Sequence, residues 1–114
     1  MKINQLIIFI ATIFVAQTVT WFQLNAQFMN DKFKDNPWLL LTGIPITWLY
    51  LKATSLGVNA FDGQMWPQRL ISFATGILIF SLMTYLVMGE TISLKNIICL
   101  LLAFSIILIQ ILVK

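Results

Sequence analysis

The side chains best suited to chemistry in this sequence lie on one face of an otherwise apolar segment near the N-terminus. Gln17, Thr20, Gln23 and Gln27 recur there at intervals of three or four residues. In a helix, which turns by about 100° per residue, these side chains fall within about 120° of one another. Amides and hydroxyls donate and accept hydrogen bonds without ionising. The pattern therefore places three amides and one hydroxyl on a single face of the predicted helix.

This polar face has two interpretations. Amide groups are costly against lipid tails, so we expect the face to point at protein or water. It can join helices, since a hydrogen bond between membrane helices contributes about 0.6–2 kcal/mol. It can equally line a cavity that takes a substrate, and the residues alone leave both interpretations open.

A third apolar segment adds two candidate residues, Arg69 and Ser72. Arg69 lies about one turn inside this segment, which begins at Trp66. A long cationic side chain at that depth either extends to the membrane interface or binds an anionic head group or substrate. Ser72 and Gly76 are four residues apart, a spacing of small residues that is typical of close helix packing.

No pattern in the sequence indicates catalysis. It contains no histidine and one cysteine, and it has neither a glycine-rich phosphate loop nor a metal-binding spacing. The four acids fall in predicted loops or at the ends of apolar segments: Asp31, Asp35, Asp62 and Glu90. The net charge of +3 is scattered, without the basic cluster that nucleic acid requires. We therefore expect no enzyme activity, metal, cofactor or nucleic-acid partner.

Four long apolar segments position the candidate residues. The 114-residue chain is 60% hydrophobic and 10% charged, with a mean hydropathy of +0.92. A helix of about 20 residues crosses a hydrocarbon core of about 30 Å. We predict an all-α membrane protein whose four transmembrane helices form one antiparallel up-down bundle with short loops. The predicted spans are 4–28, 37–55, 66–88 and 94–113.

Local signals define the connections between these spans. A charged, turn-rich connection covers Asn30–Asn36, and Pro45 is expected to kink the second span. We expect a loop over Ser55–Met65 and a short turn after Gly89. The first segment is longer than the core of a signal peptide and contains glutamines, so we expect it to remain as an uncleaved span.

Trp66 heads the third span and the pair Gly89-Glu90 closes it, before a short turn and a last apolar helix. In this arrangement the chain resembles the four-helix members of the drug/metabolite transporter superfamily, which include the small multidrug resistance proteins. A Gly-Glu pair often occupies this place in that superfamily. The resemblance covers about half of the chain by its residues and all of it by architecture.

The resemblance implies a cavity enclosed by the first three spans, with Gln17, Thr20, Trp66 and Ser72 in its lining. It also implies helices paired in a dimer. Small multidrug resistance proteins carry a glutamate in the first span that binds proton and cation alternately. The position most similar to it here holds Gln17, which cannot ionise, and the last span lacks their glycine-rich dimer seam.

Two functions from different classes follow. The first is a small transporter-like membrane protein that moves a polar or amphipathic solute or lipid without a proton-binding acid of its own. The second is an accessory or structural subunit that packs its helices onto a larger membrane complex. Expected partners are membrane lipids and either a second copy or such a complex. The candidate substrate-binding residues are Gln17, Thr20, Gln23, Gln27, Trp66, Arg69 and Ser72.

The distribution of positive charge favours one orientation. Four spans place Lys2, Lys52, Arg69 and Lys114 on one side of the membrane, and Lys32, Lys34 and Lys95 on the other. The positive-inside rule then favours both termini in the cytoplasm, and we expect a bacterial inner membrane. Charges so nearly balanced also permit insertion in both orientations.

Overall fold

The structure, a computed structural model, describes residues 2–30, 32, 34 and 36–113. Its elements are the helices α1 (Ile3–Met29), α2 (Pro37–Leu41), α3 (Gly43–Ala60), α4 (Met65–Met83) and α5 (Leu94–Leu112), with a π-helical turn, η2 (Thr84–Met88). Four segments are long and apolar enough to cross a membrane, namely α1, α2 with α3, α4 with η2, and α5. The prediction of an all-α protein with four spans is confirmed, and the chain is an integral membrane protein.

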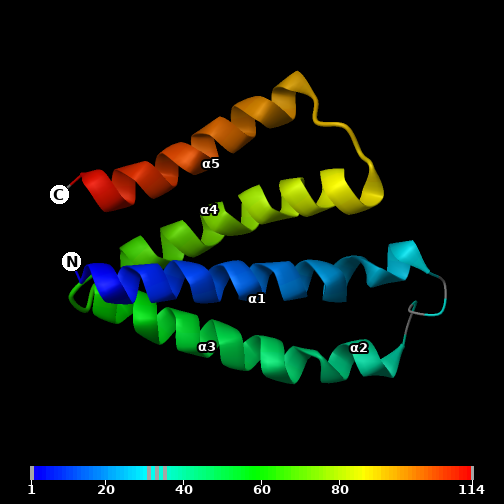
Figure 1. Ribbon diagram of the computed structural model, residues 1–114, viewed down its shortest axis with the longest axis horizontal. Helices are drawn as coiled ribbons and strands as arrows, with labels where there is room; N and C mark the ends of the chain where they lie inside the picture. Colours follow the sequence, from blue (N-terminus) through cyan, green and yellow to red (C-terminus); the bar gives the residue numbers. More distant parts are fainter. Residues whose placement is uncertain (1, 31, 33, 35, 114) are drawn as a thin grey trace.

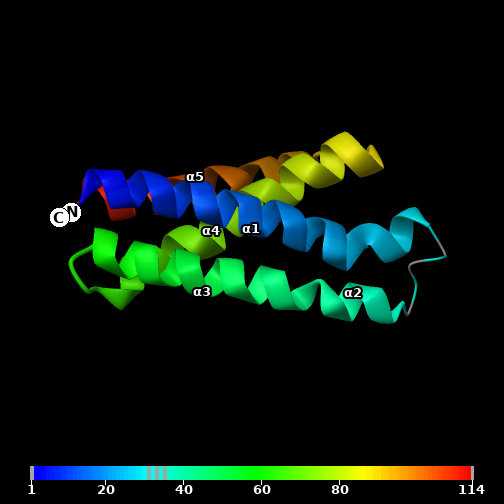
Figure 2. The same cartoon turned by 60° about the horizontal axis from the view of Figure 1, so that its bottom comes forward.

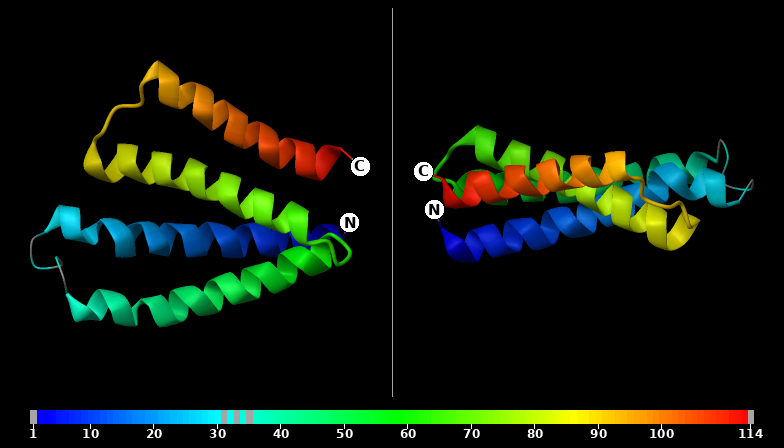
Figure 3. Two further views of the ribbon diagram at one scale, coloured as in Figure 1. Left: turned by 180° about the vertical axis from the view of Figure 1, so that it is seen from behind. Right: turned by 90° about the horizontal axis from the view of Figure 1, so that it is seen from above.

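The four spans run alternately in opposite directions, and both ends of the chain lie at the same end of the bundle (Figures 1 and 3). Across the view of Figure 1 their order is α5, α4, α1 and α3. The bundle is flattened, with extents of 47 × 36 × 18 Å. Helix α1 packs against α3 and α4, whereas α5 packs mainly on α4. The turned view of Figure 2 shows the beginning of α4 beside α1 and α3.

The hydrophobic core lies where α1, α3 and α4 meet. Phe9 of α1, Ala53 of α3 and Ile71 of α4 are fully buried there. Gly57 permits this approach, because a Cβ atom at this position would lie 2.6 Å from Cβ of Gln68 and 2.9 Å from the ring of Phe9. Small residues at such contacts let membrane helices gain close packing.

The second span is longer than predicted. It was expected to end at residue 55 and to be followed by a loop through Met65, but α3 continues to Ala60 and the loop covers only 61–64. Gly57 and Asn59 are turn-forming residues by local preference. The packing of Gly57 against α1 and α4 keeps the segment helical, because tertiary contacts override local propensity.

Proline interrupts the second span as expected. Helix α2 ends at Leu41 and α3 begins at Gly43, so the break at Thr42 lies just before Pro45. A proline ring conflicts with the carbonyl group four residues earlier, here that of Leu41.

Of the predicted connection before α2, residues 31, 33 and 35 lie outside the described residues, as does Lys114.

The ends of the helices follow from local chemistry. The Asn36 side chain accepts a hydrogen bond from the Trp38 N–H at 2.9 Å, with Pro37 in the first turn of α2. Gly89 ends η2 with φ of 72°, a left-handed conformation that glycine adopts at little cost. The glycine of the Gly-Glu pair is therefore a helix terminator.

We predict that Gly57→Ala destabilises the bundle, whereas Gly43→Ala does not. The added Cβ at position 57 meets atoms at 2.6 and 2.9 Å, whereas at position 43 the nearest atom is Nε2 of Gln23 at 3.5 Å. Overpacking costs about 1–3 kcal/mol, which exceeds the gain of about 1 kcal/mol in helix propensity. Thermal unfolding in detergent, followed by circular dichroism, should give a lower midpoint for Gly57→Ala alone. Equal midpoints for the two variants would contradict a tight contact at Gly57.

Candidate functional site

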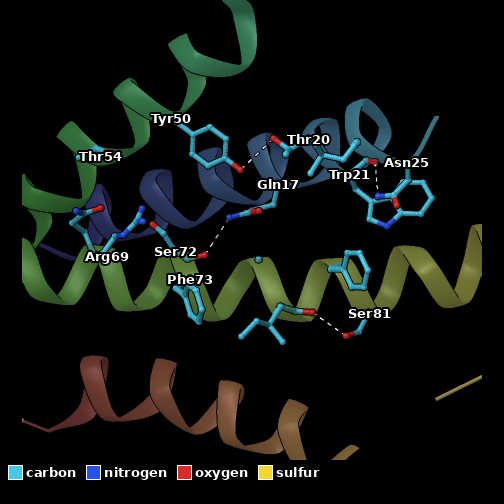
Figure 4. A pocket seen from close by; sticks show the side chains of 15 residues that line it. Gln17, Thr20, Trp21, Asn25, Tyr50, Thr54, Arg69, Ser72, Phe73 and Ser81 are labelled. Atoms are coloured by element: carbon cyan, nitrogen blue, oxygen red, sulfur yellow. Dashed lines mark hydrogen bonds between the residues drawn. The ribbon is translucent and has the colours of Figure 1, made fainter. Parts of the chain in front are cut away.

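A pocket of about 510 Å³ lies among α1, α3 and α4 (Figure 4). This volume is within the range of about 300–1,000 Å³ that is usual for small-molecule sites. Of its 15 lining residues, those from α1 lie between Gln17 and Asn25, and those from α4 lie between Gln68 and Ser81. Tyr50 and Thr54 complete the lining from α3. The pocket therefore depends on how three separate spans pack.

Gln17 joins α1 to α4 at the wall of this pocket. Its Nε2 donates a hydrogen bond to the backbone carbonyl oxygen of Ser72 at 3.2 Å. A Cβ atom at Gly76 would lie 3.0 Å from the Gln17 amide, so the missing side chain makes room for that amide. The predicted small-residue pair, Ser72 and Gly76, thus faces the polar side of α1. Gln17 therefore both bonds between helices and lines the pocket.

Several lining groups find hydrogen-bond partners within their own helix. The Thr20 and Ser81 hydroxyls each donate to the carbonyl group four residues earlier, at 2.7 and 2.9 Å. The Asn25 amide donates to the carbonyl group of Trp21 at 2.9 Å. Thr20 also lies 3.2 Å from the Tyr50 hydroxyl, across from α3. These oxygen atoms retain acceptor capacity. The pocket can therefore offer acceptors to a solute without leaving these donors unsatisfied when it is empty.

The electrostatic character of the pocket comes from one residue. Among the lining residues that the structure describes, Arg69 alone carries a charge. It lies one turn into α4 and is exposed. The aromatic side chains of Trp21, Tyr50, Phe73 and Phe80 form much of the apolar wall. The site thus combines one cationic group with an aromatic surface.

Four of the seven predicted residues line the pocket, namely Gln17, Thr20, Arg69 and Ser72. The other three lie elsewhere, each for a physical reason. Gln23 is about 120° around the helix from Gln17, so its Nε2 reaches the Leu39 carbonyl oxygen of α2 at 2.9 Å. Gln27 is exposed near the end of α1 and donates to the Leu24 carbonyl of its own helix at 3.0 Å. Trp66 is in the first turn of α4 and is 77% exposed.

The sequence did not reveal several lining residues. Trp21 is buried, and its Nε1 donates to Oγ1 of Thr84 in η2 at 3.1 Å. Asn25 continues the face of Gln17 and Trp21 at four-residue spacing, a signal obscured by the preference of asparagine for turns. Tyr50 and Thr54 are also four residues apart. Which neighbour they face depends on the packing of α3, which a single sequence does not reveal.

A second hollow of about 290 Å³ lies between α5 and the segment of α4 and η2. In Figure 1, α5 diverges from α4 towards this end of the bundle. Glu90, Asn96 and Cys99 are among its lining residues. Ile77, Phe80 and Ser81 line both hollows. The segment 77–81 of α4 therefore separates them.

Comparisons of the chain with protein-family models, with curated proteins and with solved structures found no match.

We predict that Gln17→Ala lowers the free energy of unfolding, whereas Gln27→Ala leaves it unchanged. The first variant removes a hydrogen bond between α1 and α4, and the second removes only a bond within α1 at an exposed position. Interhelical side-chain hydrogen bonds in membranes contribute about 0.6–1.7 kcal/mol. Unfolding in mixed micelles with increasing denaturing detergent should measure the difference. A loss of similar size in both variants would contradict a joining role for Gln17.

Proposed function

We propose that this protein is a small transporter of the drug/metabolite transporter type, which moves a polar or amphipathic solute or lipid across the bilayer. The observation that carries the proposal is the pocket among α1, α3 and α4, lined by amides and hydroxyls within membrane-spanning helices. Polar side chains at such depth are costly and commonly mark substrate pathways. Binding sites between the helices of a bundle are also common.

The proposed transport uses no proton-binding acid in the pocket. The lining residues that the structure describes include neither aspartate nor glutamate, and Gln17 occupies the wall where α1 meets α4. Without an ionisable acid there, a bound solute cannot be exchanged for a proton at the same group. The proposal is therefore movement of the solute down its own gradient.

We further propose a bacterial inner membrane location with both termini in the cytoplasm. Support comes from the count of basic residues along the sequence, four on the side of the termini and three on the other: Lys2, Lys52, Arg69 and Lys114 against Lys32, Lys34 and Lys95. The positive-inside rule favours a cytoplasmic location for the more basic side.

The second candidate function is that of an accessory subunit, and α5 favours it. Ala103 is the one buried residue of this helix, and many of its leucine and isoleucine side chains are exposed. A helix so little covered by its own chain can pack against a larger membrane protein. Purification in mild detergent discriminates the two functions. A second protein that co-purifies with the chain in a fixed stoichiometry supports the subunit, whereas purification of the chain without such a protein supports the transporter.

We predict that Thr54→Trp blocks transport and that Thr47→Trp does not. Both threonines are exposed on α3, but only Thr54 lines the pocket. A bulky indole at position 54 should fill the space that a solute needs. Proteoliposomes can be tested with ethidium, carboxyfluorescein, a fluorescent glucose derivative and a fluorescent phospholipid. At least one probe should cross faster than in protein-free liposomes, and Thr54→Trp should return it to that background rate.

The control variant Thr47→Trp should retain the wild-type rate for the same probe. Transport is ruled out if none of the four probes crosses faster with the wild-type protein than without it. A pathway through this pocket is ruled out if the two tryptophan variants transport equally well.

A further inference from the structure

We infer that the pocket accepts an amphipathic anion whose acidic head pairs with Arg69 and whose apolar body lies along the aromatic wall. This inference names the substrate class of the proposed transporter and rests on that proposed function. The shared chemistry is a phosphate or carboxylate on an apolar body. It can be supplied by a membrane lipid or by a free solute.

The sign of the charge follows from the lining. Arg69 is the one charged group among the described residues of the pocket, and no acid in that lining offsets it. A guanidinium group is always protonated and presents a planar fork of donors that fits carboxylate and phosphate oxygens. A cationic solute would be repelled, and the repulsion is stronger near a low-dielectric membrane than in water.

Neighbouring polar groups can complete a site for the acidic head. Figure 4 shows Arg69 of α4 and Thr54 of α3 at the same end of the pocket. Gln68, which precedes Arg69 and also lines the pocket, is only 5% exposed. The Thr54 hydroxyl and the Gln68 amide can each donate a hydrogen bond. A guanidinium with such neighbours forms a polar end to the pocket.

The rest of the pocket combines aromatic rings with amide and hydroxyl groups whose donors are already bonded within the protein, so an apolar body can lie along the rings. Asn25 and Ser81 lie at the end opposite Arg69 in Figure 4. From Arg69 to Ser81 the axis of α4 rises by about 18 Å, at about 1.5 Å per residue. The rings of Trp21, Tyr50 and Phe73 lie along this length. Aromatic side chains gain free energy by covering apolar surface. An elongated pocket with one charged end therefore fits an amphipath better than a compact polar solute.

The test compares probes of opposite charge on the wild-type protein. Phosphatidylcholine nanodiscs containing the protein are titrated calorimetrically with octyl phosphate or with octyltrimethylammonium, and empty nanodiscs supply the baseline. We expect saturable binding of octyl phosphate above the baseline and none of the cation. Equal binding of both probes, or preference for the cation, would overturn the inference without requiring any variant.

Charge substitutions locate the binding. Arg69→Gln should weaken octyl phosphate binding by about tenfold or more, because a charge-assisted pair is lost. Lys2→Gln is the matched control, since Lys2 is exposed at the same end of the bundle and does not line the pocket. Arg69→Lys keeps the positive charge but loses the planar arrangement of guanidinium N–H donors. The affinity of this variant for octyl phosphate should therefore lie between those of the wild type and Arg69→Gln. Unchanged affinity in monodisperse Arg69→Gln would place the anion elsewhere.

Lipid composition distinguishes the two sources of the anion. If a lipid head group occupies the site, octyl phosphate should bind more weakly in nanodiscs that contain phosphatidylglycerol. If a free amphipathic anion is the ligand, the affinity for octyl phosphate should be unchanged, and either result supports an anion site.

The experiments distinguish failure of the transporter proposal from failure of the anion-binding proposal. Octyl phosphate binding without transport would refute the transporter, and transport without octyl phosphate binding would refute the substrate class.

Discussion

The interior of a bilayer supplies no hydrogen-bond partners, so the amides of Gln17 and Gln23, which lie inside the span of α1, must find theirs within the protein. Gln17 meets this requirement at the Ser72 carbonyl of α4, and Gln23 meets it at the Leu39 carbonyl of α2. The two glutamines are about 120° apart around α1. Their bonds therefore direct α1 towards two different neighbours. This explains why α1 lies between α3 and α4 in the order of helices (Figure 1).

Glycine marks the contacts among these three spans. Gly76 lies beside the Gln17 amide, Gly43 lies beside the Gln23 amide, and Gly57 lies beside Phe9 and Gln68. Association in lipid lacks the hydrophobic driving force that operates in water, so close packing and polar contacts must hold the helices together. The pocket begins at Gln68, which lies beside Gly57, and extends along α4 past Gly76 to Ser81. Hydroxyl, amide and aromatic side chains line it there.

The sequence predicts the parts of this arrangement that depend on local chemistry. Hydropathy summed over a long window predicts four spans, and the third was placed at 66–88, close to Met65–Met88 of the structure. The same reasoning ended the second span too early, because the contacts that keep Gly57 helical come from α1 and α4. Helical periodicity identified Gln17 and Thr20 as members of one face. It did not reveal which neighbour each side chain of that face would meet, so Gln23 and Gln27 were grouped with them.

The place of α5 constrains how a solute would move under the proposed function. On the side of the termini the pocket ends at the exposed Arg69, and the core beside it at Phe9 and Ile71 is fully buried. Towards the opposite side, the segment 77–81 lines both the main pocket and the second hollow beneath α5. The turn η2 begins three residues after this segment with Thr84, whose hydroxyl accepts the hydrogen bond from Trp21 of the pocket wall. π-Helical turns are rare and occur frequently at functional sites. A displacement of this part of α4 would alter both hollows together while leaving the contacts at Gly57 intact.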